Sequence, residues 1–130
     1  MVEFLGKARR VHCRDAEEAC LEVLDDYDLE GVFLHCFNGR SELAEEASNR
    51  GYLIGVTTQV LYSSRVQEIV DELDLESIVL ETDSPFLYRG ERNEPVNVVE
   101  SAEKISELKN LDVQKVIDLT TKNSTDFFSR

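Results

Sequence analysis

The sequence has 130 residues, of which 42% are hydrophobic and 32% are charged. This balance predicts a folded globular protein, and the length predicts one domain, residues 1–130. No apolar run approaches the roughly 18 residues of a membrane span, and the N-terminus does not resemble a signal peptide. Three cysteines without a CxxC pair indicate reduced thiols, so we expect a cytoplasmic protein without membrane contact. The net charge of −13 excludes broad neutralisation of nucleic-acid phosphates and leaves local recognition by a metal or a few arginines.

The first part of the chain has the pattern strand, helix, strand. Ala8–His12 is the expected first strand, and a second strand at 31–35 follows the glycine that opens it. Between them, Asp15 and Glu18 form a start that resembles a capping box. The apolar positions of this predicted helix follow the helical period at 16, 19, 20, 23, 24 and 27.

The alternation continues along the rest of the chain. A second helix begins at Ser41 and precedes strand 52–56, and a third helix, capped by Ser63 or Ser64, precedes strand 78–80. The remaining pattern is helical, at 98–105 and 113–117 with a last short turn at 127–128. Such alternation is typical of parallel βα units. We therefore expect an α/β fold with four parallel strands, either half of a (β/α)8 barrel or a small open sheet.

Three potential metal ligands stand at strand ends. His12 ends the first strand, His35 ends the second, and Asp83 follows the fourth. Ligands bind at the carboxyl ends of strands in parallel α/β folds, so the three side chains would converge on one rim. Two imidazoles and a carboxylate suit Zn²⁺, Mn²⁺ or Fe²⁺. The alternative is that these are hydrogen-bonded structural residues, and the spacing alone leaves both interpretations open.

Glu81 lies two residues before Asp83 and therefore on the same side of the strand. It could orient a ligating imidazole from behind the metal site. The alternative is an ion pair with Arg14 or Arg10.

A second polar segment follows, with Arg89 and Arg92 just before Asn93, Glu94 and Pro95. One interpretation is structural, because Asn93 or Glu94 followed by Pro95 is a good helix start. The other is functional, with Arg89 and Arg92 holding a substrate phosphate beside the metal.

Five stretches, taken in chain order, resemble motifs of the TatD family of metal-dependent deoxyribonucleases. They are V-H-C-R-D-A at 11–16, H-C-F-N-G at 35–39, E-T-D-S-P-F-L at 81–87, R-N-E-P at 92–95 and T-T-K-N-S-T-D-F-F at 120–128. Each motif alone is weak, but their shared order and spacing indicate homology over nearly the whole chain. The resemblance implies that the four strands are the second half of a (β/α)8 TIM barrel.

The resemblance also implies an activity. In that family, the histidines that match His12 and His35 are metal ligands, and the aspartate that matches Asp83 binds the other metal or the attacking water. The implied enzyme is a hydrolase of phosphodiester bonds, such as those of DNA, with one or two divalent ions (Zn²⁺, Mn²⁺ or Mg²⁺). Metal-activated hydroxide would attack phosphorus with Asp83 as the base, and the Arg89 and Arg92 region would help to supply the positive field.

The chain departs from the family by matching only its second half. The H-x-H pair of the first barrel strand and a bridging Glu lie upstream in relatives, and Met1–Gly6 resembles the tail of the helix before the fifth barrel strand. Arg10 shares the side of His12, which predicts an exposed edge for this charged strand or a carboxylate partner for Arg10. Four strands alone leave open edges, so we expect a homodimer. One arrangement of it would be a two-fold eight-stranded assembly.

Two functions follow from these observations. The first is a metal-dependent hydrolase, either as a natural half-length member or as a fragment of a longer enzyme. The second is a non-catalytic half-barrel descendant that acts as a metal-binding or interaction domain. The absent upstream ligands favour the second, whereas the presence of His12, His35, Asp83 and Arg92 favours the first.

Overall fold

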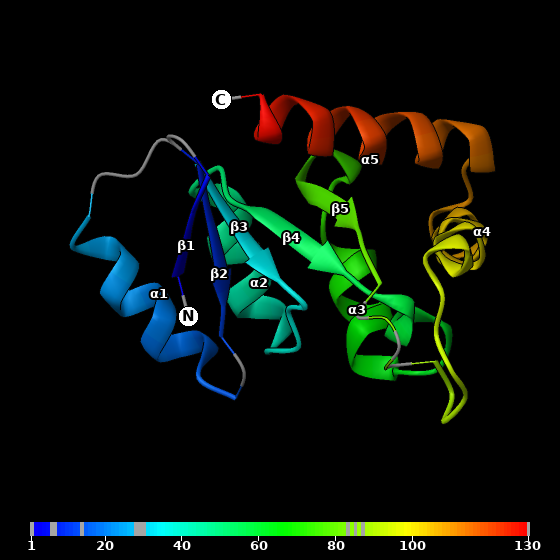
Figure 1. The fold of residues 1–130 in the computed structure, drawn as a ribbon, viewed down its shortest axis with the longest axis horizontal. Coiled ribbons are helices and arrows are strands. Elements are labelled where there is room, and N and C mark those ends of the chain that lie inside the picture. The colour runs from blue at the N-terminus through cyan, green and yellow to red at the C-terminus, as the bar shows by residue number, and fades with distance from the viewer. Residues whose placement is uncertain are drawn as a thin grey trace.

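The computed structural model describes residues 2–5, 8–13, 15–27, 31–82, 84, 86 and 88–129, with the backbone alone for residues 2–5, 8 and 9. Its centre is a five-stranded sheet of order β1-β2-β3-β4-β5 (Figure 1). The strands are β1 Val2–Leu5, β2 Ala8–His12, β3 Gly31–His35, β4 Leu53–Val56 and β5 Ile78–Leu80. Strands β2 to β5 pair in parallel, and β1 pairs with β2 in antiparallel fashion. The expected α/β arrangement with four parallel strands is therefore confirmed.

Among the described residues, five α-helices and three short 3₁₀ turns connect and follow the strands. They are α1 Glu17–Asp25, α2 Ser41–Asn49, η1 Thr58–Leu61, α3 Ser64–Glu72, η2 Leu75–Ser77, η3 Pro95–Asn97, α4 Val98–Lys109 and α5 Val113–Phe128. Ser63 caps α3 by accepting a hydrogen bond from the Val66 amide, which decides between the two expected caps. Within the described residues, no helix has the length and apolarity that a membrane crossing requires.

Three local predictions were wrong. Helix α1 begins at Glu17 with Ala16 at the N-cap, and Asp15 has a left-handed φ of 53°, so the expected capping box does not form. The buried side of α1 carries Leu21, which the predicted apolar face omitted, because a leucine buries more apolar area than the alanines chosen for that face. The expected short turn at 127–128 is instead the last turn of one continuous helix, α5.

The N-terminal segment also differs from its prediction. Met1–Gly6 was expected to be the tail of a helix, but Val2–Leu5 forms β1, in register with β2 from Val2 opposite Val11 to Leu5 opposite Ala8. Pairing with β1 satisfies the backbone groups along the outer edge of β2, which a strand would otherwise present to solvent. The predicted exposed edge for the strand of Arg10 was therefore wrong.

The parallel strands place alternate residues on two faces of the sheet. One face, the helix face, packs into the main hydrophobic core with α1 to α5 through Val11, Val32, Leu34, Ile54, Val56 and Ile78. The other face, the site face, carries Arg10, His12, Phe33, His35, Leu53, Gly55 and Val79, with Glu81 continuing it beyond β5. A small second core on the site face joins Phe33 and Val79 to Phe127 of α5, with Leu53 packed against them.

Helix α5 lies away from the arrowheads of β3 and β4 in Figure 1. Its Asn123 side chain donates hydrogen bonds to the carbonyls of Leu75 (2.7 Å) and Ile78 (2.9 Å), which fixes α5 to the start of β5. The carboxyl ends of β3 and β4 therefore remain clear of α5.

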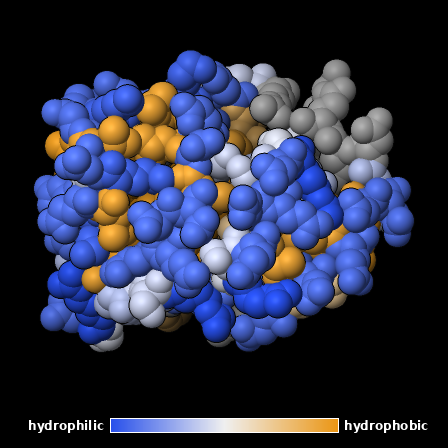
Figure 2. All heavy atoms as spheres, turned by 180° about the vertical axis from the view of Figure 1, so that it is seen from behind, coloured by the Kyte–Doolittle hydropathy of each residue, from blue (hydrophilic) through white to orange (hydrophobic). Residues whose placement is uncertain are grey.

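The surface seen from behind, in Figure 2, is predominantly hydrophilic with separate hydrophobic patches, in keeping with 27 acidic residues.

Candidate metal centre at the strand ends

The two histidines of the chain meet at the carboxyl ends of neighbouring strands. His12 ends β2 and His35 ends β3, and the parallel register places them directly opposite each other. Their ring centroids are 5.4 Å apart, with the ring planes inclined by 41°. The predicted convergence of these two imidazoles on one rim is therefore found in the structure.

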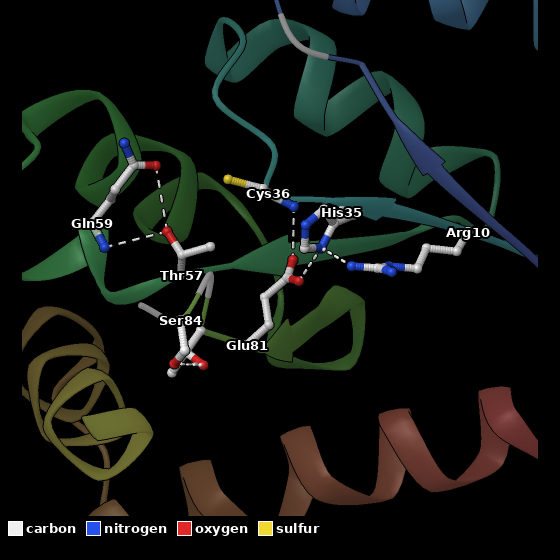
Figure 3. Close-up of polar contacts among 8 residues, drawn as sticks. Arg10, His35, Cys36, Thr57, Gln59, Glu81 and Ser84 are labelled. Atoms are coloured by element: carbon white, nitrogen blue, oxygen red, sulfur yellow. Dashed lines mark hydrogen bonds and ion pairs between the residues drawn. The ribbon is translucent and has the colours of Figure 1, made fainter. Parts of the chain in front are cut away.

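Glu81 makes the closest contact of this site. Its Oε1 forms an ion-pair contact with His35 Nδ1, and its Oε2 accepts a hydrogen bond of 2.7 Å from the backbone amide of Cys36 (Figure 3). The side chains of His35 and Glu81 are only 10% and 12% exposed, so water screens this contact little. Cys36 has a left-handed φ of 51°, a conformation that is costly for a residue with a Cβ. Carboxylate, imidazole and backbone are thus held together at the end of β3.

Arg10 joins the same cluster from β2. Its Nη2 lies 3.0 Å from His35 Nδ1, the nitrogen that also faces Glu81. A guanidinium only donates and a carboxylate only accepts, so one ring nitrogen cannot bond both in a single protonation state. The Glu81 carboxylate is also held in place by the Cys36 amide, which favours the neutral His35 tautomer with its proton on Nδ1 and its lone pair on Nε2. Arg10 then acts as a neighbouring positive charge beside the carboxylate.

The third predicted ligand, Asp83, lies outside the described residues. Its neighbours Thr82 and Ser84 are described, and their hydroxyl oxygens are 2.8 Å apart. In the part of the chain that the structure describes, no three His, Cys, Asp or Glu side chains gather into a metal centre. The described donors fit a divalent metal as a partial set, two adjacent imidazoles of which one is oriented by a carboxylate.

The two predicted phosphate-binding arginines occupy different places. Tyr88 and Glu91 form an antiparallel bridge, and Arg89 sits at its tip with a φ of 50°. Arg92 is exposed and lines a pocket of about 510 Å³ together with Ser84. The base of the turn is fixed by the hydrogen bond of 2.7 Å from the Tyr88 hydroxyl to Glu100, which raises the pKa of Tyr88. Arg92 therefore borders the segment that contains Asp83, whereas Arg89 projects from the turn.

The residues predicted to start a helix have divided roles. Pro95 does open a helical segment, as the first residue of η3, and Glu94 stands at its N-cap position with an extended backbone. Asn93 is 2% exposed, and its amide donates to Thr58 Oγ1 and to the Phe86 carbonyl, each at 2.8 Å. Its carbonyl oxygen accepts from Asn97 at 3.0 Å. Asn93 thus ties the loop after β5 to η1 and does not act as a helix cap.

One member of the site and one contact within it were not predicted from the sequence. The backbone amide of Cys36 has no sequence signal, because any residue after His35 would supply an N–H. Arg10 was recognised as facing the site but without a contact to His35. The signal for that contact was the alternation of the strand, which placed Arg10 and His12 on one face.

Comparisons with known proteins identify relatives of this chain. The family model described as TatD related DNase matches residues 3–129. An uncharacterized metal-dependent hydrolase of Methanocaldococcus jannaschii is 37% identical over 132 residues, which cover 100% of this chain and 52% of that protein. Deoxyribonuclease TATDN3 of Homo sapiens is 38% identical, over 92% of this chain and 44% of the relative.

Among solved structures, a TatD homolog from Escherichia coli superposes with a TM-score of 0.83 at 26% identity, covering 93% of this chain and 49% of the other. The chain therefore spans about half the length of the relatives it matches. The chain belongs to the family of TatD-related DNases.

Proposed function

We propose that this chain is a metal-dependent hydrolase of phosphodiester bonds, or the half of one that carries this rim. The observation that carries the proposal is the contact of Glu81 with His35, beside His12 on the neighbouring strand. A carboxylate that accepts from one imidazole nitrogen fixes the tautomer and leaves the other nitrogen as a metal ligand. A histidine pair that served packing alone would not need a nearly buried carboxylate behind it.

His12, His35 and Asp83 are the proposed ligands of a divalent metal, with Glu81 orienting His35. When bound, such a metal supplies a hydroxide at neutral pH and stabilises the charge that develops on phosphorus-bound oxygens. Zn²⁺, Mn²⁺ and Mg²⁺ are the candidates, since imidazole suits Zn²⁺ and carboxylate suits Mn²⁺ and Mg²⁺. Asp83 is the proposed base that accepts the proton of the attacking water.

DNA is the proposed substrate class. The human relative is named a deoxyribonuclease, and Arg92 provides an exposed guanidinium beside the segment that contains Asp83. A guanidinium binds two phosphate oxygens at once, which would hold the backbone of the substrate in place. Arg89, at the tip of the turn, would meet a neighbouring phosphate. Local contacts of this kind suit a chain whose net charge is −13, because the rest of its surface repels DNA.

The alternative remains a non-catalytic half barrel that binds a metal or a protein partner. Two observations favour it: the described residues form no complete metal centre, and β1 occupies the edge of β2 that a preceding barrel strand would use. In that case His12, His35 and Glu81 would bind metal weakly or act only as a polar cluster.

A homodimer is the proposed assembly. A closed parallel ring of eight strands would need the outer edge of β2, which β1 now covers, so closure requires that β1 be displaced. A dimer through the site face or the outer edge of β5 leaves β1 in place.

Native mass spectrometry with and without Mn²⁺ or Zn²⁺ reports subunit number and metal count together. A monomer at all concentrations would rule the dimer out.

The test of the function is cleavage of fluorescently end-labelled single-stranded and duplex DNA in Mn²⁺, Zn²⁺ or Mg²⁺, with a chelator as control. We expect chelator-sensitive cleavage that is lost in His35→Ala and retained in Lys115→Ala, which removes an exposed charge of α5 that lies beside Leu75 and Glu76, before the start of β5. The thiols of this chain are Cys13, Cys20 and Cys36. Assays are therefore run under reducing conditions, and we also propose a cytoplasmic location, where thiols stay reduced. Metal binding without cleavage would select the non-catalytic alternative.

A further inference from the structure

The contact between Glu81 and His35 crosses a whole strand. His35 ends β3, Glu81 follows β5, and β4 lies between these two strands in the sheet. The β4 residue beneath the crossing is Gly55, which pairs in register with Val79 of β5. Gly55 belongs to the site face, where a side chain would project toward the carboxylate.

The space above Gly55 is filled by Glu81. A Cβ placed on Gly55 would lie 1.8 Å from Glu81 Oε2 and 2.9 Å from Glu81 Cδ, both far inside contact distance. The nearest other atom is Phe33 Cε2, also at 2.9 Å. Oε2 is the oxygen that accepts from the Cys36 amide, so a methyl group at position 55 would expel the carboxylate from the place where it meets both Cys36 and His35.

Backbone conformation does not account for this glycine. Gly51 and Gly90 have φ values of 84° and 80°, which favour glycine, whereas Gly55 lies within strand β4 and pairs in register with Val79 of β5. Glycine inside a strand weakens it, since it packs no side chain and loses more entropy on folding. The feature that requires glycine at 55 is therefore the close approach of the Glu81 side chain, which follows β5.

We propose that Gly55 is a positioning residue of the metal centre: the absence of its side chain opens the passage through which Glu81 reaches His35 and sets its tautomer. Glu81 acts on the imidazole, and Gly55 acts through Glu81. This inference rests on the proposed function for its purpose, but its structural content concerns the metal-free protein and is tested there.

The experiment is a long-range ¹H–¹⁵N NMR correlation of the histidine rings in metal-free protein at alkaline pH. Wild type is expected to hold His35 with its proton on Nδ1. In Gly55→Ala and in Glu81→Ala, His35 is expected to shift to the Nε2–H tautomer that histidine prefers in water. The control is Gly51→Ala in the turn before β4, where a Cβ meets nothing within 4 Å. Its φ of 84° makes alanine costly there, so it controls for a general loss of stability, and its folded form should keep the wild-type tautomer.

A double variant tests whether Gly55 acts through Glu81. Affinity for Zn²⁺, measured by competition with a chromophoric chelator, is expected to fall about 10- to 100-fold in Gly55→Ala and in Glu81→Ala. Gly55→Ala combined with Glu81→Ala should bind no more weakly than Glu81→Ala alone, because the methyl group then has no carboxylate to displace. If wild type binds none of Zn²⁺, Mn²⁺ and Mg²⁺, the proposed function fails, and the tautomer experiment still decides the role of Gly55.

The proposal is overturned if folded Gly55→Ala retains the Nδ1–H tautomer of wild type, or if the two substitutions weaken Zn²⁺ binding additively. Should Gly55→Ala fail to fold, the double variant decides. Its folding would show that the clash with Glu81 was the cause and support the proposal. Its failure to fold would assign the space above Gly55 to Phe33 and overturn it.

Discussion

Phe33 of β3 and Phe127 of α5 meet edge to face, with ring centroids 5.8 Å apart and planes inclined by 68°. This pair covers part of the site face, the side of the sheet that carries His35. The Phe33 ring also lies 6.3 Å from the His35 ring, in an edge contact. The last turn of α5 thus packs on the site face against Phe33, whose ring in turn contacts His35 of the candidate site.

Phe127→Ala is expected to lower the free energy of unfolding by about 3–5 kcal/mol, because Phe127 is 1% exposed and its removal leaves a cavity. Phe128→Ala is the matched control, since that neighbouring ring is 53% exposed, and its cost should stay below about 1.5 kcal/mol. Urea unfolding followed by circular dichroism measures both. Equal losses would contradict the assignment of Phe127 to the second core.

Asn93→Ala is expected to destabilise the protein by about 2–3 kcal/mol, because it removes the partner of three hydrogen bonds in a buried position. Asn97→Ala removes one of these bonds from a less buried side chain and should cost about 1 kcal/mol. Thermal unfolding gives the comparison, and limited proteolysis shows whether cleavage rises at 84–97. A stable Asn93→Ala protein with an intact loop would refute this role.

Cys13 is expected to react with an aromatic disulfide reagent far more slowly than Cys20 and Cys36 in the native protein. Cys13 is 6% exposed, and burial, followed by its contact with the Cys20 thiol, raises the pKa of the Cys13 thiol well above the ordinary range. The thiolate that attacks is therefore scarce at neutral pH and increases only toward alkaline pH. Stopped-flow absorbance with single Cys→Ser variants identifies each phase. A fast phase that disappears in Cys13→Ser would contradict the prediction.

Divalent metal is expected to raise the unfolding temperature of wild type, since a ligand that binds only the folded state stabilises it. At a metal concentration 100 times the dissociation constant, the free energy of unfolding rises by about 2.7 kcal/mol. In His12→Ala and in His35→Ala the rise in unfolding temperature should shrink sharply, and in wild type a chelator should abolish it. Differential scanning calorimetry measures the shift. An equal shift in wild type and both variants would place the metal elsewhere on the protein.

Several features of the fold were predictable from the sequence because they are written in local patterns. The four parallel strands, the helices between them and the cap at Ser63 follow from hydrophobic periodicity and from one side-chain oxygen at a helix start. The meeting of His12 and His35 was also predictable, because parallel strands bring their carboxyl ends to one edge of a sheet.

Other features depended on contacts between distant segments. Val2–Leu5 became a strand because the outer edge of β2 offered a partner, and the exposed side of α1 was decided by the larger leucines that reached the core. Asn93 looked like a helix cap in sequence and proved to be a buried tie to Thr58, 35 residues earlier in the chain.

The candidate metal centre also has a predictable part and an unpredictable part. Which side chains stand at the strand ends follows from local pattern, because strand period and chain order set the face and the edge of the sheet that each residue occupies. That Glu81 turns toward His35 depends on tertiary contacts, namely on the strand between them and on Gly55, where no side chain stands in the way. A strand pattern records which residues are present along the chain, whereas the approach of Glu81 depends on space that three neighbouring strands enclose together.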